Sequence, residues 1–230
     1  MRTIGMIGGM SWESSAEYYR LANELVRDRL GGLSSARLVL ASVNFAEVER
    51  MQVEGRWDDA GRMLGGVAKG VEVAGAELML LCTNTMHIVA DAVRAAISVP
   101  FVDIVDVAAD AVTGAGLGTV GLLATGFTME QDFYRERLAT RGVRLIVPDA
   151  VDRAEVHRVI YEELCVGLVR EESRQAYREV IGRLVAAGAE GVVLGCTEIE
   201  LLVGPDDAPV PVFPTTRLHV AAAVDAALAP

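Results

Sequence analysis

The chain has 230 residues, of which 52% are hydrophobic, and a formal net charge of −11. This hydrophobic content predicts a folded core and excludes a disordered chain, while the negative charge argues against nucleic acids and anionic membrane surfaces as partners. Lysine occurs only at Lys69, within a helical pattern and followed by Gly70. We therefore expect neither a pyridoxal phosphate Schiff base nor a Walker A loop.

Short apolar runs alternate with longer amphipathic segments along the chain. Strands are predicted over residues 3–9, 37–43, 77–83, 100–105, 119–125, 143–148 and 191–197. Amphipathic helices are predicted between them, for example over 14–30 and 175–188. Continuous apolar strands that alternate with helices predict an α/β fold with parallel sheets covered by helices.

The two halves of the chain resemble each other. Residues 74–84 resemble 187–198, and their cysteines, Cys82 and Cys196, are 114 positions apart. The apolar runs beginning at Thr3 and Thr119 match at an offset of 116. This repetition predicts two pseudo-symmetric lobes.

We place these lobes at residues 1–104 and 105–211, with an active site in the cleft between them. A C-terminal helix over 212–230 can pack back on the first lobe.

Three cysteines cannot pair evenly, and the N-terminal segment lacks the pattern of a secretory signal. Both observations favour free thiols in a reducing cytoplasm. The uncharged residues 111–127 include five glycines and are not expected to span a membrane.

Cys82 and Cys196 each end a predicted strand and precede a threonine. Ligands of parallel α/β sheets bind beyond the carboxyl ends of the strands. A following helix N-terminus would favour the thiolate, which can act as a base. The alternative is that both are small buried apolar residues, but their equivalent positions in a repeat favour function. Cys165 lies in helical surroundings and is expected to serve packing.

Two thiols that face one cleft suggest proton transfer on opposite faces of a carbon. One thiolate removes a proton and the opposite thiol delivers one, so that the configuration inverts. This is general acid–base catalysis by a matched pair.

The segments "GMIGGMSWESS", "CTNTMH", "LLATGFTMEQDFY" and "LGCTEIELL" resemble the aspartate/glutamate racemase family over essentially the whole chain. The resemblance implies two α/β lobes, no metal or other cofactor, an amino-acid substrate and a homodimer. It implies that Cys82 and Cys196 are the catalytic pair.

The resemblance also implies a set of substrate contacts. Glu198 would accept a hydrogen bond from the substrate ammonium or orient the Cys196 thiol, and Gln52 would reach the side-chain end of the substrate. Hydroxyl, amide and loop groups would hold the α-carboxylate and α-ammonium; these are Met10, Thr83, Asn84, Thr85, Thr125, Thr128 and Thr197. Each threonine has an alternative as a helix cap or strand end.

One position departs from the family pattern. Val166 in "EELCVGL" stands where similar aspartate racemases have a lysine that would bind a distal carboxylate. Arg50 or Arg56 can supply that charge instead. Acidic amino acids stay slightly favoured as substrates, and neutral amino acids stay open.

Other motifs carry weaker signals. "GMIGGM" lacks the spacing of a dinucleotide-binding turn. His87 follows Cys82 by five residues, so a Cys–His nucleophilic pair is an alternative, although packing is favoured for His87. His157 and His219 are isolated, and no spacing resembles a zinc site.

We therefore predict a racemase of amino acids, independent of pyridoxal phosphate. A single-cysteine decarboxylase or isomerase and a non-catalytic amino-acid-binding protein are the alternatives.

Overall fold

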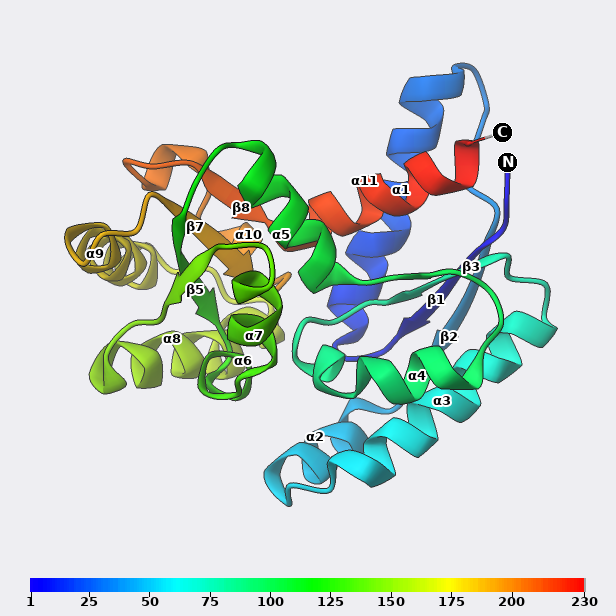
Figure 1. The fold of residues 1–230 in the computed structure, drawn as a ribbon, viewed down its shortest axis with the longest axis horizontal. Coiled ribbons are helices and arrows are strands. Elements are labelled where there is room, and N and C mark those ends of the chain that lie inside the picture. The colour runs from blue at the N-terminus through cyan, green and yellow to red at the C-terminus, as the bar shows by residue number, and fades with distance from the viewer. Residues whose placement is uncertain (230) are drawn as a thin grey trace. The chain divides into compact units, whose positions relative to one another are not determined.

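The computed structural model describes residues 1–229, and the chain divides into two compact units. Unit 1 comprises Met1–Ile104 and the segment from His219 onward, and unit 2 comprises Val105–Leu218. Each unit contains one parallel four-stranded sheet with helices on its faces (Figure 1). The predicted α/β class with two similar halves is confirmed.

The sheet of unit 1 has the strand order β2-β1-β3-β4. Its strands are β1 (Ile4–Gly8), β2 (Leu38–Ser42), β3 (Leu78–Leu81) and β4 (Phe101–Val102). The helices of this unit are α1 (Trp12–Leu30), α2 (Phe45–Val53), α3 (Trp57–Val73) and α4 (Ala90–Ala96), with a 3-10 turn, η1 (Thr85–Val89), before α4.

The alternation of side chains along the strands divides the core of unit 1 in two. Ile4 and Met6 of β1 pack with α1 and α11 (Thr215–Leu228) on one face of the sheet, whereas Ile7 packs with α2, α3 and α4 on the other. Figure 1 shows these helices on opposite sides of β1 and β3. The strands are therefore buried on both faces, which is why they are continuously apolar.

Unit 2 repeats this arrangement with the strand order β6-β5-β7-β8. Its strands are β5 (Thr119–Ala124), β6 (Arg144–Ile146), β7 (Gly191–Gly195) and β8 (Val212–Pro214). Its helices are α5 (Ile104–Gly114, beginning at the unit boundary), α6 (Gly126–Glu130), α7 (Phe133–Ala139), α8 (Ala150–Glu162), α9 (Glu171–Ala186) and α10 (Ile199–Leu202), with 3-10 turns η2 (Leu164–Val166) and η3 (Pro205–Asp207).

Two sequence predictions were wrong in detail. The strand expected over 100–105 ends at Val102, and α5 begins at Ile104 because its buried residues recur with helical spacing at Val105, Ala108, Ala109 and Val112. Residues 212–214, expected to begin the C-terminal helix, form β8 instead. This strand lies at the edge of its sheet, where prolines are tolerated.

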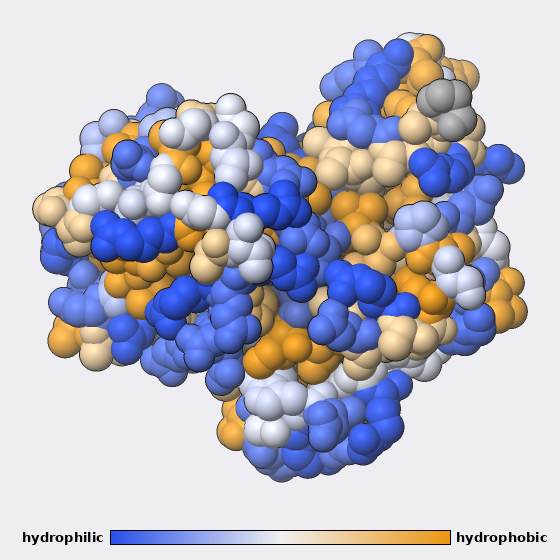
Figure 2. Space-filling view, in the orientation of Figure 1, coloured by the Kyte–Doolittle hydropathy of each residue, from blue (hydrophilic) through white to orange (hydrophobic). Residues whose placement is uncertain are grey.

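The surface in one view is mainly hydrophilic (Figure 2). In the view of Figure 2 hydrophilic residues predominate, and apolar residues form separate small groups. Within residues 1–229, no helix has the length and apolar character needed to cross a bilayer.

Two buried histidines join the elements of unit 1. His219 Nε2 donates to the carbonyl of Val102 (2.8 Å), so Nδ1 accepts from the Tyr18 hydroxyl (2.9 Å). The ring of His87 lies 5.8 Å from that of His219 at 73°. Burial, with His87 nearby, lowers the pKa of His219 to about 3.

This shift predicts a pH-dependent stability. In the unfolded chain His219 binds a proton below about pH 6.5, whereas the folded chain does not, so the free energy of unfolding falls as pH drops below 6.5. The expected contribution is ~1.4 kcal/mol per pH unit. His219→Gln keeps one donor and one acceptor but does not titrate, so its stability should depend less on pH. Urea unfolding between about pH 5 and about pH 7.5 measures both slopes, and equal slopes would contradict the assignment.

Candidate active site

The turn after β1 is fixed by a glycine and a serine. Gly9 has φ +91°, and a Cβ there would lie 2.2 Å from the carbonyl oxygen of Val43, so only glycine fits. The Gly9 N–H donates to Ser15 Oγ at 2.7 Å. Met10, which follows, is 6% exposed and packs with Met51 and Met86 of unit 1. The turn is thus held by α1 on one side and by the core on the other.

Cys82 follows β3 directly and is fully buried. Its N–H donates to the carbonyl of Ile7 (2.9 Å), and its carbonyl accepts from the Ser14 hydroxyl (3.3 Å). These bonds fix the backbone on both sides of the thiol. Burial raises the pKa of the Cys82 thiol well above its usual range, so the thiol is protonated in the free protein.

His87 fixes the segment that follows Cys82. Its Nε2 accepts from the Ile104 N–H (3.2 Å), so its Nδ1–H donates to the carbonyl of Thr83 (2.7 Å). Both ring nitrogens are therefore engaged with the backbone, and neither is available to a cysteine proton. This geometry disfavours the Cys–His pair and assigns His87 a packing and positioning role.

Gln52 has a buried side-chain atom without a hydrogen-bond partner among residues 1–229. It lies on α2, is 4% exposed, and its Nε2 contacts Met86 Sδ at 3.0 Å. Its Oε1 is buried without a hydrogen-bond partner. A buried carbonyl without a donor costs about 1–3 kcal/mol, so Gln52 Oε1 is a candidate acceptor for a ligand or a water.

In unit 2, Cys196 follows β7 and is paired with a carboxylate. Its Sγ donates to Oε2 of Glu198 at 3.0 Å. Burial raises the pKa of the Cys196 thiol, and the charge of Glu198 raises it further. Cys196 therefore differs from Cys82, because a proton acceptor lies within hydrogen-bond distance of its sulfur.

Two threonines of α11 support the Cys196 segment. The Thr215 hydroxyl donates to the carbonyl of Leu194 (2.7 Å), and the Thr216 hydroxyl donates to Thr197 Oγ1 (3.0 Å). Thr215 and Thr216 are both fully buried. They hold the end of β7 and the residue that follows Cys196.

Thr125 and Thr128 form a closed turn at the end of β5. Thr125 caps α6, accepting from the Thr128 N–H at 3.3 Å, and the two hydroxyl oxygens lie 3.1 Å apart. Both residues are buried. The register of β5 against β7 aligns Ala124 with Gly195, so Thr125 and Cys196 leave neighbouring strands at the same level.

The structure distributes the predicted site residues between the units, at the carboxyl ends of the central strands or on elements beside them. Unit 1 holds Met10, Gln52, Cys82, Thr83, Asn84 and Thr85, and unit 2 holds Thr125, Thr128, Cys196, Thr197 and Glu198. All are buried. The sequence analysis did not predict four supporting residues, because a hydroxyl side chain near the start of a helix is the only feature that marks them. These residues are Ser14, Ser15, Thr215 and Thr216.

The positions considered for binding the distal carboxylate of a substrate lie on the surface. Val166 is 63% exposed in η2, and Arg50 is exposed on α2. Arg56 pairs with Glu54 (2.7 Å) and Asp59 (3.2 Å). Arg56 is thus already engaged with two carboxylates.

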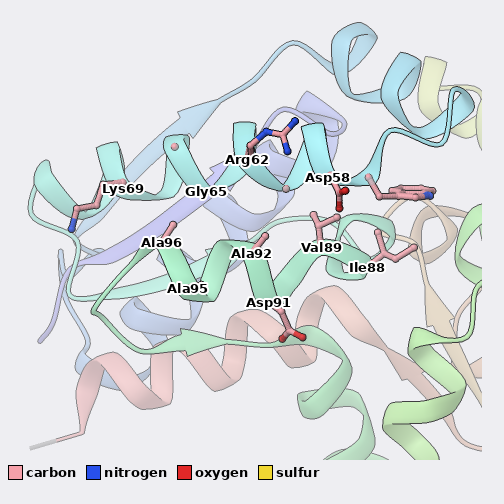
Figure 3. Close-up of a pocket in the computed structure, with 13 residues that line it drawn as sticks. Asp58, Arg62, Gly65, Lys69, Ile88, Val89, Asp91, Ala92, Ala95 and Ala96 are labelled. Carbon is pink, nitrogen blue, oxygen red and sulfur yellow. The ribbon is translucent and has the colours of Figure 1, made fainter.

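A separate groove lies between α3 and α4 (Figure 3). Its floor is made of small residues: a Cβ at Gly61 would lie 3.0 Å from that of Ala92, and one at Gly65 would lie 3.2 Å from that of Ala96. None of the predicted site residues lines it. These small residues let the two helices pack closely.

The Asp/Glu/Hydantoin racemase family profile matches residues 7–223. The chain belongs to this family. A protein of known structure from Yersinia pestis is 50% identical over the full length of both chains, with a TM-score of 0.93. An aspartate racemase homologue from Pyrococcus horikoshii is 34% identical over 99% of both chains, with a TM-score of 0.87.

More distant racemases share parts of the sequence or the fold alone. A glutamate racemase from Roseiflexus is 30% identical over 142 residues, and the match spans about half (47%) of that protein. The glutamate racemase of Aquifex pyrophilus is 15% identical with a TM-score of 0.62, which shows a shared fold.

The Cys196–Glu198 contact predicts the reactivity of the thiol in this racemase-family chain. Glu198→Gln removes the adjacent negative charge, so the pKa of Cys196 should fall. In a Cys82→Ser, Cys165→Ser background, the pH at half-maximal alkylation rate by iodoacetamide should move down. Glu179→Gln, at an exposed position of α9 in the same unit, is the matched control and should leave it unchanged. An unchanged pH dependence of alkylation in Glu198→Gln would contradict the predicted effect of Glu198 on the pKa of Cys196.

Proposed function

We propose that this protein is a cofactor-independent amino-acid racemase, an isomerase in which Cys82 and Cys196 exchange protons with the α-carbon. The observation that carries the proposal is the duplicated position of these cysteines. Each follows the third strand of a parallel sheet, and the two sheets have the same strand order. Membership of the racemase family and the 34% identity to an aspartate racemase homologue support it.

The proposed step exchanges one proton on each face of the substrate. A thiolate of one cysteine takes the α-proton and becomes a thiol, leaving a carbanion conjugated with the substrate carboxylate. The thiol of the other cysteine gives its proton to the opposite face and becomes the thiolate. Atoms and charge balance, and the reverse reaction uses the same groups with exchanged roles.

Because both thiols are buried, one of them must first lose its proton for this chemistry to begin. Both thiols are protonated in the free protein because burial raises the pKa of each. A thiolate formed in such a site is poorly solvated and therefore a stronger base than in water. Glu198 is the group within reach to take the Cys196 proton, so we propose that Glu198 generates the thiolate of Cys196.

The remaining polar groups are proposed to hold the amino acid. Thr83, Asn84, Thr85, Thr125, Thr128 and Thr197, together with the Met10 turn, would bind the α-carboxylate and α-ammonium. The buried Gln52 Oε1 needs a donor, which the substrate would provide at its side-chain end.

We further propose that aspartate or glutamate is the preferred substrate and that the protein acts as a homodimer in the cytoplasm. Sedimentation velocity tests the dimer.

A single-cysteine decarboxylase or isomerase is the second candidate. The observation that favours it is the asymmetry of the two cysteines: the Cys196 thiol donates to a carboxylate, whereas the hydrogen bonds described for Cys82 are made by its backbone N–H and carbonyl. An arylmalonate decarboxylase mutant shares the fold, with 15% identity and a TM-score of 0.55.

The two candidates differ in their response to cysteine substitution. If both thiols act, the wild-type protein should exchange the α-proton of aspartate or glutamate for solvent deuterium, as followed by NMR. Cys82→Ser and Cys196→Ser should each reduce racemisation by at least about 10²-fold, and Cys165→Ser should retain it. Full turnover in either of the first two variants would refute the two-thiol mechanism and favour the single-cysteine candidate.

Val166 provides a test of the substrate class. Because Val166 is exposed, Val166→Lys should fold normally. If η2 faces the distal end of the substrate, the added charge should lower KM for aspartate and glutamate by about tenfold relative to neutral amino acids. Val169→Lys, on the same loop and 49% exposed, is the matched control. Equal effects of both variants would show that only net charge matters.

A further inference from the structure

His157 takes no part in the proposed proton transfer. It lies on α8, and its Nδ1 accepts a hydrogen bond from the Gly126 N–H at 3.0 Å. Because Nδ1 accepts, the ring is neutral and carries its proton on Nε2. The ring lies 4.6 Å from that of Tyr161 and meets Phe127 edge-on at 6.0 Å. These contacts fix its orientation.

The bonded N–H belongs to the turn that carries two proposed substrate contacts. Gly126 is the first residue of α6, so its N–H has no acceptor within the helix. It lies directly after Thr125, whose hydroxyl oxygen is 3.1 Å from that of Thr128. The imidazole therefore supplies the external hydrogen bond that anchors the start of this turn.

We infer that His157 is a positioning residue whose neutral ring holds the Thr125–Thr128 turn in place and whose protonation releases it. A protonated ring has a donor on both nitrogens. Nδ1–H would then face the Gly126 N–H, and the turn would lose its acceptor. The consequence for substrate binding rests on the proposed function, whereas the consequence for the turn does not.

The charges around the ring favour its neutral form. Glu130 and Arg153 line the same hollow as His157 and pair with each other at 3.4 Å, and Tyr161 supplies the other titratable group against the ring. Burial lowers the pKa of His157, and Glu130 partly opposes this shift. The release is therefore expected below pH 6.5, the ordinary value for histidine.

The first test is NMR of the ¹⁵N-labelled full chain, which needs no activity. The Gly126 amide proton should shift upfield as pH falls, with the same midpoint as the His157 ring. His157→Asn places an amide oxygen near the position of Nδ1 and does not titrate, so the Gly126 signal should become independent of pH. A Gly126 amide that stays constant while wild-type His157 titrates would overturn the inference, whether or not the protein racemises amino acids.

The second test uses racemisation kinetics from about pH 5 to about pH 8. Wild-type KM should rise at the acid end while kcat changes little. His157→Asn should keep the neutral-pH KM and lose this rise. His157→Leu should raise KM by about three- to tenfold at every pH, because one hydrogen bond is lost. A rise in KM that persists in His157→Asn would overturn the role.

A matched control separates charge from positioning. Glu130→Gln removes the carboxylate that raises the pKa of His157 but keeps the imidazole acceptor. It should move the NMR midpoint to lower pH and leave KM at about pH 8 unchanged. A changed KM at that pH would mean that the ion pair, and not His157, holds the turn.

Discussion

The parallel hydrogen-bond ladder between the two central strands of each sheet is the constraint on which the site depends. In unit 1 the ladder aligns Ile7 with Leu81, so the Gly9 turn and Cys82 leave the sheet together. In unit 2 it aligns Ala124 with Gly195, and Thr125 and Cys196 leave together. A slip of one residue would turn each thiol to the opposite face of its sheet. The buried apolar faces of the strands prevent that slip.

The proposed chemistry requires that a thiolate forms and that it is a strong base, and burial has opposite effects on these two requirements. It stabilises the thiol over the thiolate, which opposes the start of the reaction, and it strengthens the base once it has formed. The two units meet these requirements differently. Cys196 has a carboxylate beside its sulfur, whereas the Cys82 segment is held by backbone bonds and by the imidazole of His87. A pair that is symmetric in fold is therefore asymmetric in electrostatics.

Much of the fold followed from the sequence because parallel strands buried on both faces are continuously apolar and because the pattern occurs twice. The edge strand β8 was not predicted, because three residues that include a proline are too few to show the alternation typical of a strand. The cysteines were found because their neighbours repeat, whereas Thr215 and Thr216 were missed because their partners are distant in sequence. The role of His157 could not be predicted either, because its partner is a backbone N–H 31 positions away. Hydrogen bonds of this kind depend on tertiary structure, and no local pattern encodes them.

The path of α11 has a consequence for the order of folding. This single helix gives Thr215 and Thr216 to unit 2 and, from His219 onward, completes the core of unit 1 beside α1. Unit 2 is continuous in sequence, but unit 1 is not. During synthesis, residues 1–104 leave the ribosome first, yet this face of their sheet is packed by α1 without α11 until the rest of the chain has been made. The unit that is translated first is therefore the unit whose core needs the residues made last.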